Sequence, residues 1–320
     1  MFLGIEIGGT KLQLGVGPDD GKLRGLWRGA VDVAAGPEDI RRQIVAAVPE
    51  LLADAGIERG ELRGVGIGFG GPVDDATHTV IKSHQIEGWD NFPLADWITD
   101  LLDLSAVLGN DADVAGLAEA LHGAGKGLSP IFYITIGSGI GGGFIINGEI
   151  YRGCGRGAAE IGHLRIPIPN NVYPMAIRSL EEVASGWGIE KQAKTSLSYD
   201  GSGQAIILRR LRGNRPLSVP LLAEAARQGD PVVTRVFQDA WNALAESLCH
   251  VIALLCPRRI VIGGGVSLMG EKLLFEPLRQ LVAERVFKPF AGLTDIVPAA
   301  LGEEVVVHGA IALARQRLGG

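Results

Sequence analysis

Short apolar runs alternate along the chain with longer segments in which apolar residues recur every three or four positions. Two apolar runs, residues 2–7 and 11–16, flank Gly8-Gly9, and this arrangement predicts a hairpin. Residues 38–55 carry apolar side chains at helical spacing and end at Gly56. Because strand patterns alternate with helix patterns in this way, the sequence predicts an α/β architecture.

The same two periodicities predict the remaining elements. Further strands are expected over 65–69, 105–108, 131–136, 143–150 and 260–262. Helices are expected over 110–122, 180–196, 204–212, 219–228, 230–255, 271–286 and 306–317. A strand-rich part precedes residue 113 and a helix-rich part follows it, so we expect a domain boundary there.

Composition narrows the class of protein. The chain has 320 residues, a length typical of two domains, and 47 of them are glycine, which indicates many tight turns. The net charge is −6 and no basic run occurs, so neither a nucleic-acid nor a membrane partner is expected. Cys154, Cys249 and Cys256 are too scattered for a disulfide framework, and no signal peptide is visible, which favours the cytoplasm.

Two glycine-rich turns follow predicted strands. Gly8-Gly9-Thr10-Lys11 comes after the first strand, and residues 137–143 come after the strand over 131–136. Glycine leaves backbone N–H groups open to an anion, so both turns suit a phosphate group held from two sides. A tight structural hairpin is the alternative for each turn. A dinucleotide site is not favoured, because the strand-like run 144–146 follows where a helix would be required.

Polar residues cluster where predicted strands end. Asn110-Asp111 ends a strand and opens a helix, so the pair is either a helix N-cap or a site at which Asp111 accepts a proton from a substrate hydroxyl. Asp113 is expected on the surface. Glu160 and His163 lie in a glycine-rich loop and offer partners for hydroxyl groups. Gly263-Gly264-Gly265 either seats a nucleoside or merely turns the chain.

In this order the motifs resemble the ROK family of sugar kinases, within the actin, hexokinase and Hsp70 fold group. The segments that carry the resemblance are 6–11, 68–73, 88–89, 110–112, 118–120, 135–143, 147–148, 151–153, 160–163, 263–267 and 309–310. The resemblance implies two ribonuclease-H-like α/β domains around a central cleft. It places residues 1–113 and the C-terminal helix, 304–320, in a small domain and 114–303 in a larger one.

The resemblance also implies roles for individual residues. Asp111 matches the catalytic base. The sugar-binding positions are matched by Gly71, Asn110, Asp111, Glu160, His163 and Glu181, with Glu182 as the alternative to Glu181. The ATP- and phosphate-binding positions are matched by Gly8, Gly9, Thr10, Lys11, Gly137, Ser138, Gly139, Gly141, Gly264 and Gly265. ATP and Mg²⁺ are the implied cofactors, and a homodimer is the implied assembly.

Two departures from the family pattern bear on metals. Glu6 stands where the family usually has an Asp associated with Mg²⁺. The glutamate keeps the charge but has a longer side chain, so we expect Glu6 to take part in Mg²⁺ binding only indirectly. The family's cysteine cluster is missing from 167–175, so we expect no structural zinc. His163, which matches a zinc ligand of relatives, must then be oriented in another way.

Three functions compete at this point. The first is an ATP-dependent hexose kinase, with glucose as the default substrate and N-acetylmannosamine or fructose as alternatives. The second is a sugar-responsive repressor, which is disfavoured because the first strand starts at residue 2 and leaves no room for a helix-turn-helix segment. The third is a sugar-binding relative of the kinases that has lost catalysis.

Overall fold

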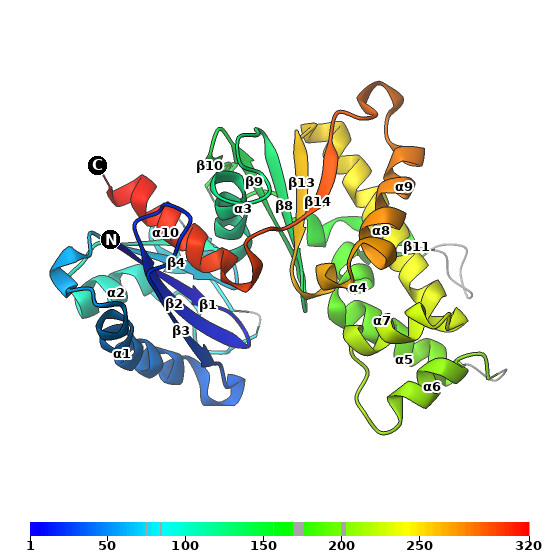
Figure 1. Ribbon diagram of the computed structural model, residues 1–320, viewed down its shortest axis with the longest axis horizontal. Helices are drawn as coiled ribbons and strands as arrows, with labels where there is room; N and C mark the ends of the chain where they lie inside the picture. Colours follow the sequence, from blue (N-terminus) through cyan, green and yellow to red (C-terminus); the bar gives the residue numbers. More distant parts are fainter. Residues whose placement is uncertain (75, 84, 156, 169–175, 200–202, 320) are drawn as a thin grey trace. The chain divides into compact units, whose positions relative to one another are not determined.

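The computed structural model describes residues 1–74, 76–83, 85–155, 157–168, 176–199 and 203–319. Two five-stranded sheets form its framework (Figure 1), in the orders β3-β2-β1-β4-β7 and β10-β9-β8-β13-β14. When the strands of each sheet are numbered 1 to 5 in chain order, both sheets have the same spatial order, 3-2-1-4-5. This repeated arrangement, with helices between strands, confirms the predicted α/β class.

The first sheet combines a hairpin part with a parallel part. Its strands are β1 (Phe2–Ile7), β2 (Lys11–Gly17), β3 (Gly25–Ala30), β4 (Val65–Phe69) and β7 (Ala106–Asn110). β1, β2 and β3 pair antiparallel, as the expected hairpin over 2–16 requires, whereas β1, β4 and β7 pair parallel. The carboxyl ends of β1, β4 and β7 therefore meet at one edge of the sheet.

The two faces of this sheet carry different side chains. Leu3 and Ile5 belong to an apolar cluster with residues of α1 (Gly36–Ala55) and α2 (Leu94–Leu102). Along the strands, glycines alternate with these apolar residues and therefore point to the opposite face of the sheet. On that face α10 (Val305–Leu318) packs against β1, β4 and α3 (Asp111–Leu121). A Cβ on Gly66 would lie only 1.8 Å from the Ala310 carbonyl oxygen, so this face needs glycine for the helix to approach.

The second sheet corrects one expected boundary. Its strands are β8 (Ile131–Ile136), β9 (Ile140–Ile146), β10 (Glu149–Ile150), β13 (Arg259–Gly263) and β14 (Asp295–Pro298). The single strand expected over 143–150 is wrong, because β9 begins at Ile140 and a turn separates it from β10. The glycine turn is therefore shorter than expected, and Gly141 lies within β9.

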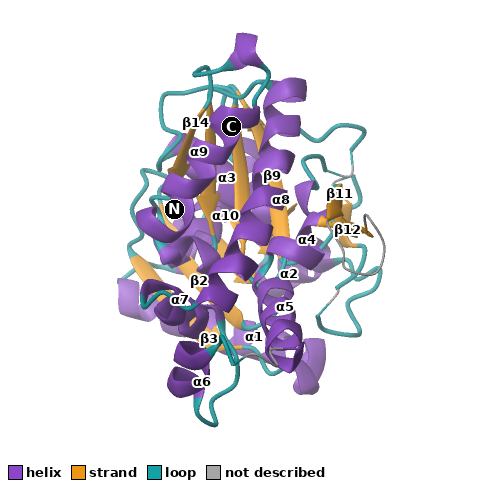
Figure 2. Cartoon of the chain, turned by 90° about the vertical axis from the view of Figure 1, so that its right-hand side faces the viewer, coloured by secondary structure: helices purple, strands orange, loops and turns teal. Residues whose placement is uncertain are grey.

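Most of the remaining helices surround α8 (Pro231–Leu255), which packs against α4 (Leu180–Ala184), α5 (Gly186–Tyr199), α7 (Val219–Arg227) and α9 (Glu276–Arg285). Figure 2 shows α4 and α5 beside α8. The helix expected over 180–196 is interrupted at Ser185. The other short elements are α6 (Ile206–Arg212), β5 (Val73–Asp74), β6 (Thr79–Val80), β11 (Arg165–Ile168) and β12 (Ala176–Ser179). None of the helices in the described part of the chain is both long enough and apolar enough to span a bilayer.

The chain forms two compact units. The first contains Met1–Tyr133, Gly143–Ala159 and Ala299–Gly320, and the second contains Ile134–Gly142 and Glu160–Pro298. The first unit is larger than the small domain expected from residues 1–113 and 304–320, since it also includes α3 and β10. As a division into functional domains, the boundary at residue 113 stays a prediction.

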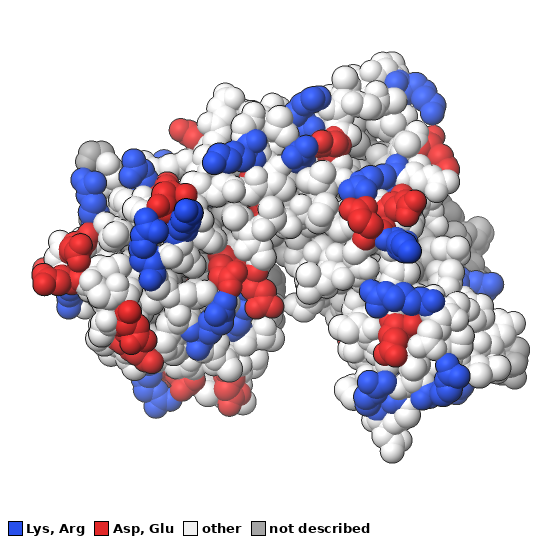
Figure 3. All heavy atoms as spheres, viewed as in Figure 1, with Lys and Arg blue, Asp and Glu red and all other residues white. Residues whose placement is uncertain are grey.

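Charged side chains are mixed on the surface. On the face drawn in Figure 3, Lys and Arg are interspersed with Asp and Glu. Ion pairs in the described part of the chain include Arg24 with Asp20 at 2.8 Å and Arg259 with Asp295 at 2.7 Å.

Candidate functional site

Three of the predicted motifs meet at the edge where the parallel strands of the first sheet end. The turn Gly8-Gly9 follows β1, Gly70-Gly71 follows β4, and Asn110-Asp111 joins β7 to α3. The backbone N–H of Gly70 donates to the carbonyl oxygen of Ile7 at 2.9 Å, which ties the first two turns together. In α/β sheets the carboxyl edge of parallel strands is where ligands bind, so the topology favours a site here.

Asn110 joins two of these motifs. Its Oδ1 accepts the backbone N–H groups of Ala112 at 2.9 Å and Asp113 at 3.3 Å, so the residue caps α3 as the N-cap alternative predicted. Its Nδ2 donates to the carbonyl oxygen of Gly71 at 3.0 Å. The two predicted sugar-binding residues, Asn110 and Gly71, are therefore in direct contact.

The Asp111 carboxylate lies beside the second of the three turns. Its Oδ1 accepts the backbone N–H of Ala112 at 2.8 Å. A Cβ added to Gly70 would lie 3.5 Å from Asp111 Oδ2. The same added Cβ would lie 3.5 Å from the Cα of Gly8. A carboxylate that faces two glycine turns can reach a small substrate held against them.

Asp113 is not on the surface, so that expectation is wrong. The residue is 3% exposed. It lies on the side of α3 that meets β9, where a Cβ on Gly143 would stand 3.1 Å from the Cα of Asp113. The sequence around Asp113 is typical of an exposed first helical turn, and only the packing of a distant strand against it causes the burial.

Glu6 is a buried carboxylate that pairs with a partly exposed lysine next to the first glycine turn. The residue is 4% exposed, and its Oε1 lies 2.9 Å from the Nζ of Lys11. Burial raises the pKa of Glu6 to about 7, Lys11 opposes this rise, and the charges of Asp111 and Glu303 add to it. The carboxylates of Glu6 and Asp111 are therefore close enough to influence each other.

Two residues from distant parts of the chain, Gln85 and Glu303, contact the first turn, and they were not identified from the sequence. Lys11 Nζ donates to the carbonyl oxygen of Glu303 at 2.9 Å, almost three hundred positions away in the chain. The side chain of Gln85 lies against Gly9, where a Cβ would stand 1.1 Å from its Oε1. Thr10 is exposed at the tip of the turn. No local pattern marks Gln85 or Glu303, because only the fold brings them to this turn.

The second glycine turn is held by a residue of α4 and by the first residue of α5. The backbone N–H of Gly186 donates to the carbonyl oxygen of Gly137 at 2.8 Å. The backbone N–H of Ile140, at the other end of the turn, donates to Glu181 Oε2 at 2.8 Å. Between these anchors Ser138 is exposed. The turn is thus fixed at both ends, with its centre open to solvent.

Glu181 and Glu182 have different environments. The Glu182 carboxylate accepts hydrogen bonds from the backbone N–H of Ser179 at 2.8 Å and from its hydroxyl at 3.1 Å, in a capping box that opens α4. These hydrogen bonds hold the pKa of Glu182 below its usual range. Glu181 is the one that contacts the glycine turn, which favours it over Glu182 as the residue with a role at the site.

Glu160 precedes a short 3₁₀ turn, Ile161–His163, whose last residue is His163, and both side chains are exposed. The turn packs closely on β9, since a Cβ on Gly162 would lie 2.2 Å from the carbonyl oxygen of Ile140. Among the described residues no group of three or more His, Cys, Asp and Glu side chains is arranged to hold a metal ion. Residues 169–175, part of the segment in which the family's cysteine cluster is missing, lie outside the described residues.

Gly264 and Gly265 lie at the end of β13, next to β8 in the sheet. Gly264 has a φ of 83°, and a Cβ there would lie 2.6 Å from the carbonyl carbon of Ile136, the last residue before the second glycine turn. A Cβ on Gly265 would have no atom within 4 Å. Gly264 therefore lets two chain segments touch, whereas the space above Gly265 is open to a ligand.

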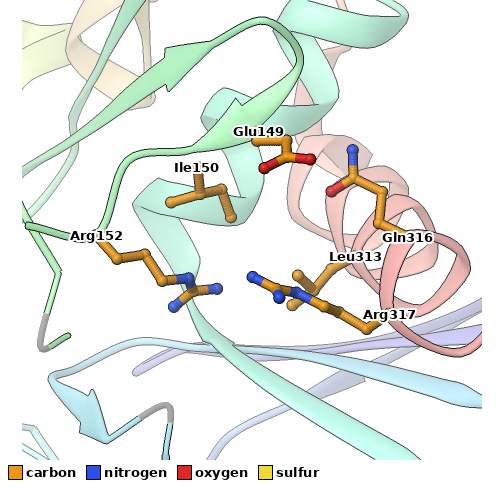
Figure 4. Close-up of a pocket in the computed structure, with 6 residues that line it drawn as sticks. All are labelled: Glu149, Ile150, Arg152, Leu313, Gln316 and Arg317. Carbon is orange, nitrogen blue, oxygen red and sulfur yellow. The ribbon is translucent and has the colours of Figure 1, made fainter.

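A small pocket lies elsewhere in the first unit, between β10 and α10. It encloses about 70 Å³ and is lined by Glu149, Ile150, Arg152, Leu313, Gln316 and Arg317. Figure 4 shows the guanidinium groups of Arg152 and Arg317 pointing toward each other across it. No predicted site residue lines this pocket, so it is separate from the site described above.

Comparison with known proteins identifies the family. The model of the ROK family matches residues 2–317. The chain belongs to the ROK family. Its relatives include a glucokinase of Thermotoga maritima, 31% identical over 100% of this chain and 98% of the relative. A glucokinase of Halalkalibacterium halodurans is 29% identical over 99% of this chain and 95% of the relative.

A solved ROK structure extends the match to the fold. The crystal structure of a ROK family glucokinase from Streptomyces griseus, in complex with glucose and AMPPNP, aligns with a TM-score of 0.78 and 31% identity. The alignment covers 98% of this chain and 99% of the other. The expected resemblance to the ROK family and its actin-like ATPase fold is therefore confirmed, and it extends over almost the whole chain.

Proposed function

We propose that this ROK protein transfers the γ-phosphoryl group of ATP to a hydroxyl group of a hexose, with Asp111 as the general base and glucose as the substrate. The observation that carries the assignment is similarity to glucokinases over essentially the full length of the chain, including one with glucose and an ATP analogue bound. The chain is accordingly an ATP-dependent hexose kinase. Glucose is the specific substrate that these relatives support.

The chemistry assigned to Asp111 follows from its surroundings. Its carboxylate lies at the carboxyl edge of three parallel strands and at the N-terminus of α3, where the helix dipole favours a negative charge. A carboxylate in that position can orient a sugar hydroxyl and accept its proton as the phosphoryl group is transferred. Asn110 and Gly71, already joined by a hydrogen bond, would hold the sugar beside it.

The two glycine turns would bind the phosphate groups. Gly8, Gly9, Thr10 and Lys11 contribute to the first turn, and Gly137, Ser138 and Gly139 form the second. The backbone N–H groups of Gly8 and Gly137 donate within their own turns, so the other N–H groups of the two turns, together with the Lys11 ammonium, would neutralise charge that develops on the transferred phosphoryl group. The turns belong to different compact units, so their action on one phosphate group is part of the proposal.

The remaining site residues complete the proposal. Glu160, His163 and Glu181 would bind sugar hydroxyls, because the first two are exposed beside the second turn and the third is anchored to it. Gly264 and Gly265 would face the nucleoside. Gly141, within β9, would support the second turn rather than form it.

The acidic residues near the first turn suit Mg²⁺. This ion is bound in proteins by one or two carboxylates together with phosphate oxygens and water. Asp111 faces the first two glycine turns, whereas Glu6, whose carboxylate is held by Lys11 and Gln13, would act on the ion only indirectly. Bound Mg²⁺ would supply neutralisation of the ATP phosphates.

We further propose that the protein acts as a homodimer in the cytoplasm, and sedimentation velocity would test the dimer.

The test is a coupled ADP-release assay over glucose, mannose, fructose, N-acetylglucosamine and N-acetylmannosamine. We expect turnover with glucose in the presence of Mg²⁺. The variant Asp111→Asn should lose about 10³-fold or more in kcat while its ATP affinity is retained, because the base is removed and the turns are not. Asp54→Asn, an exposed position on α1, is the matched control. Full activity of Asp111→Asn would exclude Asp111 as the base, and failure of the wild type with every sugar would exclude the kinase.

A further inference from the structure

Gln13 is a polar side chain in the core of the first unit with no assigned role. It lies on β2 and is 2% exposed. The pattern of β2 places Leu12 and Leu14 on one face, in the apolar cluster, and Gln13 on the opposite face, toward α10. A buried amide must find hydrogen-bond partners, so its presence among apolar neighbours needs a reason.

The strand pairing decides which residues Gln13 meets. Glu6 on β1 is the direct cross-strand partner of Gln13 in the antiparallel pair. Lys11 precedes Gln13 by two positions in β2, so the two side chains emerge on the same face. Cross-strand partners and next-but-one neighbours are the residues whose side chains can touch on a sheet. The three polar residues therefore form one group on the α10 face.

The hydrogen bonds of this group form a closed network. With its amide oriented to satisfy its neighbours, Gln13 Nε2 donates to Glu6 Oε2 at 3.1 Å and to the carbonyl oxygen of Glu303 at 3.2 Å. Lys11 Nζ contacts the same two residues, Glu6 Oε1 at 2.9 Å and the Glu303 carbonyl at 2.9 Å. Both oxygens of the Glu6 carboxylate are thus held, one by Lys11 and the other by Gln13.

We infer that Gln13 is a positioning residue for phosphoryl transfer: its amide fixes the Glu6 carboxylate and, through it, keeps the Lys11 ammonium at the first glycine turn. The inference rests on the proposed function, which gives that turn the ATP phosphates. An amide suits the task because it adds a donor for Glu6 without a second positive charge that would compete with Lys11 for the carboxylate. Leucine is the residue on the opposite face of β2, at positions 12 and 14. A leucine at position 13 would leave Glu6 Oε2 buried without this donor.

The experiment measures binding of Mg·AMPPNP and of glucose by isothermal titration calorimetry. The proteins are the wild type, Gln13→Met, Glu6→Gln and the double variant. Methionine has nearly the volume of glutamine and lacks the amide. Gln43→Met is the matched control, because Gln43 also donates two hydrogen bonds, to Asp39 at 2.8 Å and to the Ala30 carbonyl at 3.1 Å, but from α1, on the opposite face of the first sheet from Gln13.

We expect Gln13→Met to weaken Mg·AMPPNP binding about tenfold, the effect of one hydrogen bond to a charged group, and to leave glucose binding unchanged. In the Glu6→Gln background the same substitution should have no further effect, since Gln13 acts through the Glu6 carboxylate. Gln43→Met should bind both ligands as the wild type does. Gln13→Asn, whose shorter amide cannot reach the same partners, should repeat the loss.

Unchanged nucleotide affinity in Gln13→Met would overturn the inference, as would an equal loss with and without Glu6. If neither Gln13→Met nor Gln13→Asn folds, the residue is structural and the inference also falls. Failure of the proposed function looks different. In that case the wild type itself does not bind Mg·AMPPNP, and both the function and the inference are refuted together.

Discussion

The Glu181 carboxylate accepts a hydrogen bond of 2.8 Å from the backbone N–H of Ile140. One residue predicted to bind the sugar thereby holds the turn predicted to bind phosphate. The contact requires glycine at position 139, where a Cβ would lie 2.5 Å from Glu181 Oε2. If Glu181 binds the sugar and this turn binds phosphate, as proposed, the two ligands would affect each other through Glu181, within the second unit alone.

The substitution Glu181→Gln should lower kcat/KM about 10- to 100-fold for both glucose and ATP. The amide keeps the size of the side chain but weakens the charge-assisted hydrogen bond that fixes Ile140, and such bonds contribute about 1.5–3 kcal/mol. Steady-state kinetics with each substrate varied in turn measures the effect. Glu182→Gln is the matched control and should remain near wild type, because that carboxylate caps α4 at Ser179. A larger loss in Glu182→Gln would reverse the assignment.

Stability should depend on pH through Glu6. Burial raises its pKa from 4.5 to about 7 in the folded protein, so between these values the folded state binds more protons than the unfolded chain. The contribution of Glu6 to the free energy of unfolding is then greatest below pH 4.5 and falls as pH rises toward 7, by about 3 kcal/mol at most. Urea unfolding without Mg²⁺ or nucleotide, from pH 4.5 to 8, measures it.

The control for this pH dependence is Glu6→Gln, which cannot titrate. The difference in unfolding free energy between wild type and Glu6→Gln should decline across the window and level off above pH 7. Parallel curves for the two proteins would show that Glu6 ionises in the folded state as it does in the unfolded chain.

The substitution Gly66→Ala should destabilise the protein by about 3 kcal/mol, since the added Cβ would stand 1.8 Å from the Ala310 carbonyl oxygen and α10 must move. Thermal and urea unfolding measure the loss. Gly60→Ala is the matched control, because a Cβ there has no atom within 4 Å. It should change stability by less than about 0.5 kcal/mol. Equal stability of the two variants would mean that α10 does not pack on this face in solution.

The substitution Glu119→Gln should cost about 3 kcal/mol of stability. Glu119 is completely buried on α3, and its carboxylate accepts the backbone N–H groups of Ala124 at 2.7 Å, Ala300 at 2.9 Å and Leu301 at 2.9 Å. An amide presents an NH₂ group to at least one of these donors, which is then left unsatisfied. Urea unfolding tests this, with the exposed Glu149→Gln as control. A loss no greater than that of the control would show that the hydrogen bonds from Glu119 to Ala300 and Leu301, just before α10, do not stabilise the protein.

Local features of the site could be predicted from sequence because neighbouring residues decide them. Glycine pairs turn the chain wherever they follow a strand, and Asn110 caps a helix because its side chain reaches the backbone two and three residues ahead. Gly309 likewise lets α10 approach α3 closely, since a Cβ there would lie 1.7 Å from the Val114 carbonyl oxygen.

Features that depend on distant partners were missed or wrong. Asp113 follows an N-cap in a pattern typical of exposed acids, yet β9 covers it. The break in the expected helix at Ser185 accompanies the hydrogen bond from Gly186 to Gly137, a partner almost fifty positions earlier in the chain. Gln13 reads as one polar residue in an apolar strand until the pairing with Glu6 is known.

By itself the sequence determined many of the strands and helices, though not β3, α2 or β14, and it also determined where glycine lets the backbone turn and which ROK motifs the chain carries. These features were accessible because periodicity and turn chemistry act over a few residues. The tertiary structure decided what the polar side chains contact. The packing of α10 on the glycine face of the first sheet buries Glu6 and gives Lys11 and Gln13 a shared acceptor at Glu303. Long-range packing sets burial, and burial determines whether a carboxylate is a surface charge or part of a site.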